Sequence, residues 1–534
     1  MKKTSILLSV VALAASLSAN AQNPYMPMWE YIPDGEPYLF EDPDCPGKYR
    51  VYVYGSHDNL IDKYCGRDQV VWSAPVEDLS QWRYDGIIFK SVTDANGALL
   101  SPSGVGDILY APDVAVKKDA SGKTWYYLYP NNQARGRASQ IAVSDRPDGP
   151  FKVTNWNKEN PARTDGILGF DPGVFVDDDG RVYGYWGFEE SNGAELDPTT
   201  MASVKPGTQI VKDMVDSYKQ PGIFNFFEAS SMRKIEDKYV FIYSRKTVEG
   251  EFGLPQSNYT LAYAYGDSPL GPWTYGGTLI DGRARDVDDN GNAICTANPY
   301  GNTHGSILEI NGQWWVFYHR QTGTDEYSRQ AMVAPITVKV EKGKGGKVTI
   351  SEGEYNSEGF RTQGLDPLYK TPAGWACYYT NPKGIGQDYP HFLFTGSYIK
   401  STRLNPDSYE GPYNQKQPYC PVVNNTSGSV VGYKYFNFDQ VSKAKAVELN
   451  MDIVPEGVDG KITVLVGGPK TSRGGKVIAE YSVSAKDAKQ MKNVTVKCAD
   501  MKAVKGKQPL FFVFSSPTQD ASICELHDFQ FIVK

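Results

Sequence analysis

The sequence predicts an all-β protein, a five-bladed β-propeller followed by a β-sandwich domain. Aromatic residues make up 13% of the 534 residues, and 52 Gly and 34 Pro supply many turns. Between residues 31 and 335, short runs of alternating residues are separated by Asp-Gly, Asn-Gly and Pro-Gly, and helical periodicity is nearly absent. In this part of the chain one strand-turn unit recurs five times. Repetition of a small sheet at intervals is typical of a propeller.

The recurring unit is clearest at residues 224–245, FNFFEASSMRKIEDKYVFIYSR. Glu228 opens the unit, Glu236 and Asp237 form a hairpin turn, and residues 239–243 alternate like a half-buried strand. Four more units place one polar residue before an aromatic strand: Asp34 before YRVYVYGS, Asp113 before TWYYLYP, Asp171 before RVYGYWG and His304 before QWWVFYHR. Each unit should therefore present this side chain at the same place in its own sheet.

Five blades around one axis would bring these five polar side chains to one funnel. Clustered carboxylates are unfavourable, because each negative charge raises the pKa of its neighbours. Hydrolysis of a glycosidic bond uses such an arrangement: one protonated carboxyl protonates the leaving oxygen, and one ionised carboxylate activates water or attacks carbon. The funnel could supply both groups.

Six motifs carry a resemblance to a known family: IPDGEPYLF, YVYGSHD, LYAPDV, GFDPGVFVDDDGRVYGYW, FFEASSMRK and NTHGSILEINGQWWVFYH. In this order they resemble the blade motifs of family 43 glycoside hydrolases, five-bladed propellers that act on arabinose- and xylose-containing glycans. The resemblance covers about residues 23–340. It implies that Asp34 is the general base, that Asp171 tunes the general acid, and that Glu228 is the general acid.

The resemblance also implies a set of substrate-binding residues, namely Glu36, Asp58, Asp113, His304 and Arg329. No cofactor is required for the chemistry, but a structural calcium ion is implied, held by His304 through water. The acidic run at residues 177–179 is interpreted instead as a hairpin turn, because Asp-Gly after a strand usually forms one.

The first blade leaves the identity of the base open. It reads Asp34-Gly35-Glu36-Pro37, where the family usually has Asp-Pro, so either acid could be the base. Asp34 has the more usual spacing to His57 and Asp58 and is preferred. Being two residues apart, both acids would face the same side of an extended strand.

These residues predict an exo-acting, inverting glycosidase that releases terminal sugars, most readily α-L-arabinofuranose, from plant-type polysaccharides or oligosaccharides. The alternatives are a β-xylosidase or β-galactofuranosidase of the same fold, and a non-catalytic glycan-binding propeller. The expected partner is a carbohydrate. The net charge of −7 argues against nucleic acid or an anionic membrane as a partner.

The ends of the chain suggest further domains. Residues 1–21 read as a signal peptide, with Lys2 and Lys3 before an apolar run at 6–15, so the protein should be exported to the periplasm or secreted. The propeller is predicted over residues 22–345, a connector over 346–367 and the sandwich over 368–534. Seven strands are expected in the sandwich, at 430–438, 446–454, 461–466, 476–483, 493–498, 508–514 and 524–533. The sandwich weakly resembles a family 6 carbohydrate-binding module, and it would either bind sugar or support the propeller.

Overall fold

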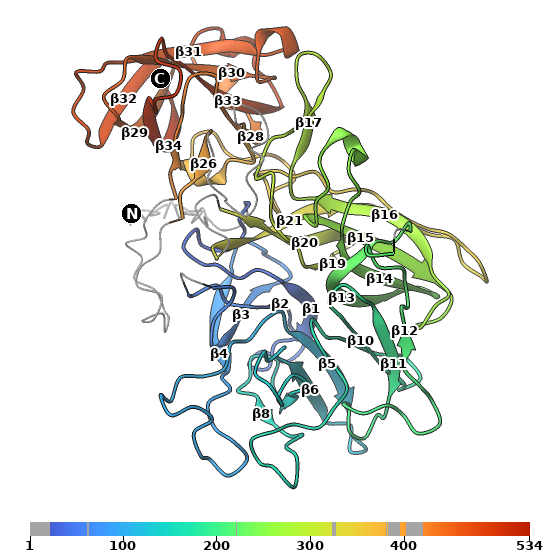
Figure 1. The fold of residues 1–534 in the computed structure, drawn as a ribbon. Helices are drawn as coiled ribbons and strands as arrows, with labels where there is room; N and C mark the ends of the chain where they lie inside the picture. The colour runs from blue at the N-terminus through green and yellow to red at the C-terminus, as the bar shows by residue number, and fades with distance from the viewer. Residues whose placement is uncertain are drawn as a thin grey trace, which may run out of the picture.

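The computed structural model describes residues 22–60, 63–220, 222–322, 327–380, 382, 396–401 and 420–534. The predicted signal peptide at 1–21 lies outside these residues. The fold class is confirmed: a five-bladed β-propeller is followed by a β-sandwich, which stands at the top of Figure 1 in orange and red.

Four blades are four-stranded antiparallel sheets in up-and-down order, and the fifth has three strands. Blade 1 contains β1 (Glu36–Glu41), β2 (Tyr49–Gly55), β3 (Gln69–Pro75) and β4 (Arg83–Phe89). Blade 2 contains β5 (Asp113–Lys118), β6 (Thr124–Tyr129), β7 (Ala142–Ser144) and β8 (Lys152–Val153). Blade 3 contains β9 (Gly173–Val176), β10 (Val182–Trp186), β11 (Asn192–Leu196) and β12 (Val211–Lys212). Blade 4 contains β13 (Phe226–Ile235), β14 (Lys238–Arg245), β15 (Thr260–Gly266) and β16 (Thr274–Asp281). Blade 5 contains β19 (Ser306–Ile310), β20 (Gln313–Gln321) and β21 (Arg329–Ile336).

Two of the predicted turns form as expected. Glu236 takes φ 56° at the tip of the β13–β14 hairpin, a conformation typical of tight turns. The acidic run at 177–179 joins β9 to β10, where the Gly180 N–H donates to the Asp177 carbonyl at 2.9 Å. Two further hairpins lie outside the blade sheets: β17 (Arg285–Val287) with β18 (Ala293–Cys295) between blades 4 and 5, and β22 (Val338–Val340) with β23 (Val348–Ile350) after blade 5.

Hydrophobic clusters fill the spaces between neighbouring blades. Successive side chains of a strand point to opposite faces, so each middle strand contributes to two clusters. On β2, Val51 and Val53 pack toward blade 5, whereas Tyr52 and Tyr54 pack toward blade 2. The alternating aromatic strands seen in the sequence therefore supply the side chains that pack between neighbouring blades.

The N-terminal segment ties the propeller closed beside blade 5. The Asn23 side chain donates to the Val333 carbonyl at 2.6 Å and accepts from the Val333 N–H at 3.0 Å. One amide side chain thus makes the two hydrogen bonds that a paired strand would make with β21.

The sandwich consists of two packed sheets. One sheet has the strand order β26-β27-β34-β29-β32 with β24 paired to β34, and the other has the order β25-β28-β33-β30-β31. The short strands are β24 (Thr371–Pro372), β25 (Tyr378–Tyr379), β26 (Tyr398–Ile399) and β27 (Val422–Val423). The long strands are β28 (Val430–Asn437), β29 (Val447–Pro455), β30 (Gly460–Val466), β31 (Lys476–Val483), β32 (Lys492–Lys497), β33 (Lys507–Ser515) and β34 (Cys524–Val533). All seven strands expected from the sequence are present, with ends within one residue of those expected.

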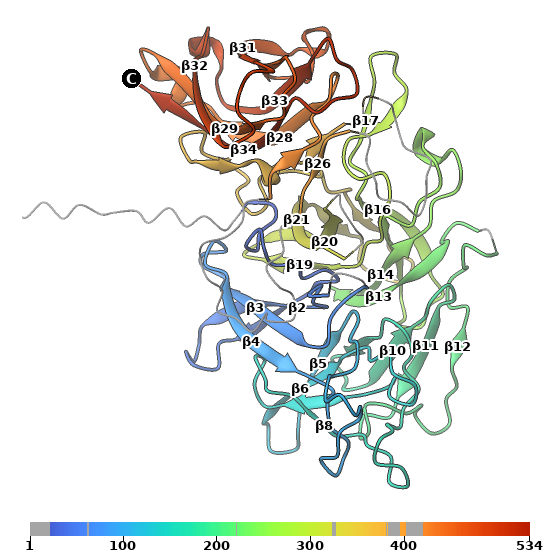
Figure 2. The same cartoon turned by 60° about the vertical axis from the view of Figure 1, so that its left-hand side comes forward.

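The sandwich packs against blade 5, as both ribbon views show (Figures 1 and 2). A single hydrophobic cluster runs from blades 4 and 5 into the sandwich core. The buried Arg320 of β20 donates to the carbonyl of Ala376 at 2.8 Å and to that of Gly374. The Tyr379 N–H donates to the Thr296 carbonyl at 2.6 Å. This interface is therefore part of the folded core and not a loose tether.

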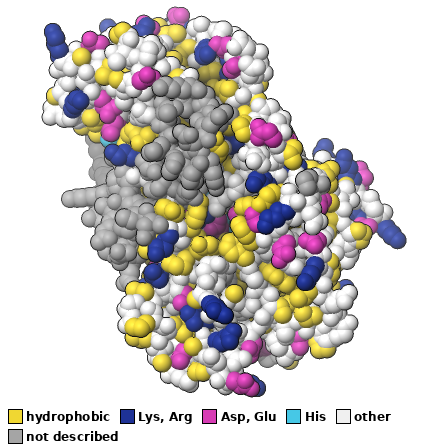
Figure 3. All heavy atoms as spheres, viewed as in Figure 1, with side chains coloured by type: hydrophobic (Ala, Val, Ile, Leu, Met, Phe, Trp, Pro, Cys, Tyr) yellow, Lys and Arg dark blue, Asp and Glu magenta, His cyan; other side chains and the backbone are white. Residues whose placement is uncertain are grey.

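Over the part of the chain that the structure describes, no helix is long and apolar enough to cross a membrane. Acidic and basic side chains are interspersed over the face drawn in Figure 3.

Candidate active site

The candidate site lies where the inner strands of the blades meet. β1, β5, β9, β13 and β19 contact one another around the propeller axis, and the Tyr38 hydroxyl of β1 donates to Asp113 of β5 at 2.5 Å. A cavity of about 480 Å³ opens beside this ring of strands, within the size range of small-molecule sites. The polar side chains that line it include Asp34, Asp171, Glu228 and Arg329.

Asp34 is held by three partners on the blade 1 and blade 5 side of the cavity. Its carboxylate accepts from the Ser56 hydroxyl and from Arg329 Nη1, the latter at 3.2 Å. Its backbone N–H donates to His319 Nδ1 at 3.1 Å. Burial opposes ionisation of Asp34, but the positive charge of Arg329 and the hydrogen bond from Ser56 favour the carboxylate, so the pKa of Asp34 lies below its ordinary value. Asp34 is therefore ionised at neutral pH.

His319 fixes the backbone at Asp34. Because His319 Nδ1 accepts the Asp34 N–H, the ring proton is on Nε2, which donates to the Asn302 carbonyl at 2.8 Å. Burial lowers the pKa of His319 to about 4, which keeps this acceptor unprotonated. Asp34 takes φ 61°, a left-handed conformation that a non-glycine residue adopts at a cost. The hydrogen bond to His319 stabilises it.

This conformation separates Asp34 from Glu36. The extended geometry expected across residues 34–36 is wrong, because Asp34 is left-handed and β1 begins only at Glu36. Glu36 does not line the cavity, and its carboxylate pairs with Arg233 Nη2 at 2.8 Å and accepts from the Ser231 hydroxyl at 3.2 Å. Of the two acids, only Asp34 faces the cavity.

Glu228 lies on the opposite, blade 4 side. The pairing of β13 with β14 is irregular between Phe226 and Ser231, and Ala229 takes φ 69°. In a regular strand Phe227 and Glu228 would point to opposite faces, but this bulge turns both toward the cavity. Within the described residues, the Glu228 carboxyl makes no side-chain hydrogen bond or ion pair. Burial, followed by the charge of Asp34, raises the pKa of Glu228 to about 8.

Asp171 lies between Asp34 and Glu228 in the sequence, just before β9 of blade 3. Its carboxylate accepts from Asn131 Nδ2 at 2.7 Å and from the Ala229 N–H at 3.2 Å. Burial and the charges of Glu228 and Asp34 raise the pKa of Asp171 as well. Among the described residues Asp171 accepts two N–H groups and Glu228 accepts none, so hydrogen bonding favours the ionised form of Asp171 more than that of Glu228.

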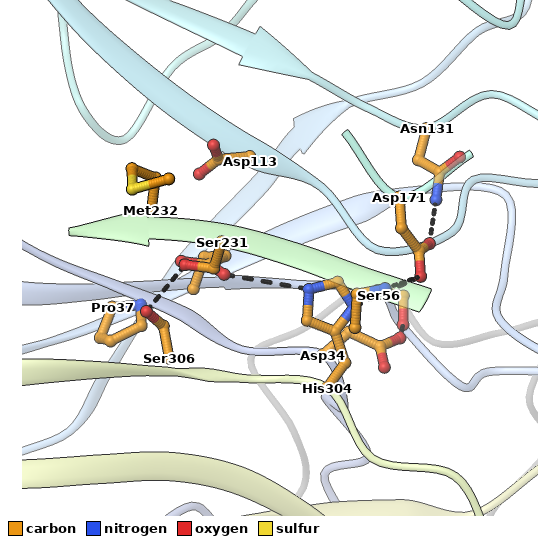
Figure 4. A network of polar contacts seen from close by, with 12 residues as sticks. Asp34, Pro37, Ser56, Asp113, Asn131, Asp171, Ser231, Met232, His304 and Ser306 are labelled. Atoms are coloured by element: carbon orange, nitrogen blue, oxygen red, sulfur yellow. Dashed lines mark hydrogen bonds and ion pairs between the residues drawn. The ribbon is translucent and has the colours of Figure 1, made fainter. Parts of the chain in front are cut away.

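Beneath the cavity lies a buried polar core along the axis. In Figure 4 the His304 ring lies between Asp34 and Asp171 on one side and Ser231 on the other. His304 Nδ1 is 3.7 Å from Asp171, and Nε2 is 3.9 Å from the Glu36 carboxylate. Burial lowers the pKa of His304 to about 4, so the ring is neutral.

Two further acids predicted from the sequence, Asp113 and Asp58, are held by buried hydrogen bonds. Asp113 accepts from the Val174 N–H at 2.6 Å and does not line the cavity. Asp58 accepts from Arg329 Nε and Nη2 at 2.9 and 2.8 Å, which holds that guanidinium beside Asp34. Asp58 therefore acts behind the cavity, through Arg329.

The residues around His304 do not form a metal cage. No group of three or more His, Cys, Asp or Glu side chains among the described residues is arranged to hold a metal ion. The carboxylate nearest His304 on the inner side, Glu36, is already paired with the partly buried Arg233. Over the part of the chain that the structure describes, no direct cage of His, Cys, Asp or Glu is therefore seen for the structural calcium ion implied by the resemblance.

Several residues that shape the site were not singled out from the sequence. Ser56 directly follows β2, and Asn131 lies just beyond the end of β6. His319 lies near the end of β20. In an antiparallel hairpin the end of the second strand lies beside the start of the first, where the predicted acids are. Polar residues at the ends of the aromatic strands were therefore a usable signal. The aromatic residues of the cavity, Tyr110, Phe170, Phe188 and Phe227, had no comparable signal.

Comparison with known proteins agrees with this architecture. The model of the glycosyl hydrolases family 43 matches residues 45–342. A xylosidase/arabinosidase of Thermoclostridium stercorarium is 33% identical over 446 residues, which cover 79% of this chain and 84% of that protein. An arabinoxylan arabinofuranohydrolase of Paenibacillus polymyxa is 28% identical over 320 residues, covering 55% of this chain and 44% of that protein.

Among solved structures, a family 43 arabinoxylan arabinofuranohydrolase from Bacillus subtilis, in complex with cellotetraose, aligns with 96% of this chain and 98% of its own. Its TM-score is 0.45 at 21% identity. The family model spans more than half of the sequence, and the match to the Thermoclostridium relative covers 79% of it. The chain belongs to the glycosyl hydrolases of family 43.

Proposed function

We propose that this glycoside hydrolase is an exo-acting, inverting enzyme that releases terminal α-L-arabinofuranose from plant-type polysaccharides or oligosaccharides. One observation carries the proposal: the same cavity holds an acid that is ionised, Asp34, and an acid that keeps its proton near neutral pH, Glu228. These are the two protonation states that glycoside hydrolysis requires.

In the proposed reaction Glu228 donates its proton to the glycosidic oxygen as the bond to the leaving sugar breaks. Asp34 accepts a proton from the water that attacks the anomeric carbon from the opposite face. In this proposal Asp171, whose carboxylate accepts from Asn131 and from the Ala229 N–H, helps to keep the proton on Glu228, because a negative charge nearby disfavours ionisation of a second carboxyl. Arg329, held by Asp58, keeps Asp34 ionised.

An exo mode of action is supported by the closed end of the cavity. Beneath Asp34 and Asp171 the axis is filled by the buried side chains of His304 and Glu36 and by the partly buried Arg233. A sugar therefore enters the cavity from its open face, and a terminal residue can reach the closed end without needing a passage for the rest of the chain.

The choice of sugar is supported by the names of the relatives, xylosidase/arabinosidase and arabinoxylan arabinofuranohydrolase. These names equally favour β-xylose as the alternative sugar, ahead of β-galactofuranose. A non-catalytic glycan-binding propeller is disfavoured because a binding site has no use for a protonated Glu228 beside an ionised Asp34.

The test is hydrolysis of a panel of aryl glycosides by the chain from Gln22 onward, followed by NMR of the fresh product. We expect arabinofuranoside to be the best substrate, inversion at the anomeric carbon, and a separation of about 6.5–9.5 Å between the Asp34 and Glu228 carboxyls in a crystal structure. Retention of configuration, or a covalent glycosyl-enzyme, would contradict the proposed reaction.

The proposal includes export of the protein to the periplasm or medium after removal of residues 1–21, which N-terminal sequencing of the mature protein can test. It also assigns the sandwich mainly a supporting role, which the shared hydrophobic cluster and the Arg320 hydrogen bonds favour.

A further inference from the structure

The two sides of the cavity differ in chemistry. The side formed by blades 1 and 5 carries Asp34 and Arg329, which are charged. The side formed by blades 3 and 4 carries Glu228 together with three phenylalanines, Phe170, Phe188 and Phe227, which we call the aromatic wall. The general acid therefore stands on the apolar side, and the base stands on the charged side.

The rings of the aromatic wall form a continuous row. Phe188 contacts Phe170 and Phe227 edge to face, with ring centres 5.3 Å apart in each case. Tyr110 extends the row beyond Phe170, and Tyr218 extends it beyond Phe227. Phe188 nevertheless leaves 48% of its surface exposed. A large apolar side chain exposed at a cavity mouth marks a binding surface when its neighbours converge on the same cavity.

Phe188 is exposed but its backbone is well held. The next residue, Glu189, takes φ 60°, and its N–H donates to the Phe227 carbonyl at 2.6 Å. The Glu189 carbonyl accepts from Ser217 Oγ at 2.5 Å, and its carboxylate accepts from the Tyr218 hydroxyl and pairs with Lys219. The loop is already ordered before a ligand binds. Binding therefore costs little conformational entropy of the loop, which favours affinity.

From this arrangement we propose that the aromatic wall is the binding site for the leaving part of the substrate, and that Phe188 stacks against the pyranose ring next to the cleaved bond. In an inverting hydrolysis water attacks from the side of the base, and the leaving sugar departs on the side of the acid. The leaving sugar must therefore lie over the wall that carries Glu228. This inference rests on the proposed function.

The chemistry of the wall selects a class of leaving group. A β-linked pyranose such as a backbone xylose has its hydroxyls at the ring edge and presents flat C–H faces, which pack well on aromatic rings. A puckered furanose presents no such face. The wall therefore favours substrates in which the released sugar is attached to a pyranose backbone over substrates in which it is attached to another arabinofuranose.

The test compares the wild type with Phe188→Ala on two substrates that carry the same released sugar. One is an oligosaccharide with a xylose backbone, and the other is the glycosyl fluoride, whose leaving group has no ring. We expect Phe188→Ala to lower kcat/KM on the oligosaccharide about tenfold or more and to leave kcat/KM on the fluoride within about twofold. A matched control is Phe252→Ala, because Phe252 is also exposed, at 38%, but does not line the cavity.

Equal losses on both substrates, or no loss on either, would overturn the inference. A second measurement does not depend on hydrolysis: xylotetraose is titrated calorimetrically into Glu228→Gln with and without Phe188→Ala. We expect a Kd about tenfold weaker without the ring, and an unchanged Kd would refute the role of the wall. If the wild type releases neither arabinose nor xylose, the proposed function fails, and the titration still decides the inference separately.

Discussion

The alkaline limb of the pH profile should report the proton on Glu228. With a pKa raised to about 8, about 90% of the carboxyl is protonated at pH 7, against about 0.3% at the ordinary value of 4.5. The cavity thus supplies about 300-fold more of the active protonation state at neutral pH. For a substrate with a poor leaving group, kcat/KM should fall above about pH 8.

The perturbation is Asp171→Asn, which removes a negative charge and keeps the size of the side chain. A negative charge on Asp171 would disfavour ionisation of Glu228, so its removal should lower the pKa of Glu228 and move the alkaline limb to lower pH. Burial is the largest cause of the raised pKa, so the limb should move only part of the way toward 4.5. A substrate with a good leaving group needs no proton and should lose much less activity.

The assay is a pH series of kcat/KM for wild type, Asp171→Asn and Glu228→Gln, with one good and one poor leaving group. Glu228→Gln should abolish the limb and lower the rate on the poor leaving group roughly 10²–10⁴-fold. Asp177→Asn, a change outside the cavity, is the matched control and should leave the limb in place. If Asp171→Asn keeps the wild-type limb and loses activity equally on both substrates, Asp171 positions the sugar and burial alone raises the pKa.

Four further outcomes are expected. Asp34→Asn should lower kcat by several orders of magnitude, whereas Glu36→Gln should retain most of it, and steady-state kinetics showing the reverse would move the base to Glu36. His319→Asn should keep an acceptor for the Asp34 N–H and much of the kcat, while His319→Phe should lose both with little change in KM; equal kcat values would refute the positioning role. Arg320→Met should lower the Tm by several degrees, because two carbonyls of the sandwich lose a buried donor, and an unchanged thermal melt would argue against a supporting sandwich. Treatment with EDTA should leave activity and Tm unchanged, and a loss restored by Ca²⁺ would establish the calcium ion implied by the resemblance.

Local patterns in the sequence were enough to predict the strands and the order of the blades. Two kinds of pattern extend over only a few residues: the alternation along β2 and β14, and the turn residues at 177–180 and 236–237. Such local patterns can be recognised in the sequence without knowledge of the fold. The same holds for the seven main strands of the sandwich, whose predicted ends lie within one residue of the observed ones. The motif series also pointed to the three acids that line the cavity, Asp34, Asp171 and Glu228.

The amino-acid sequence encodes, within single units, which segments form strands and which acids begin the inner strands. Which side chains reach the cavity depends instead on contacts between units that are distant in the sequence. Asp34 faces it and Glu36 does not, because His319, far away in the sequence, accepts the Asp34 N–H and stabilises a left-handed backbone. Phe227 faces it beside Glu228 because β13 bulges, and Phe188 joins them through a loop tied to blade 4. Contacts between blades set these positions, and no pattern within one blade encodes them.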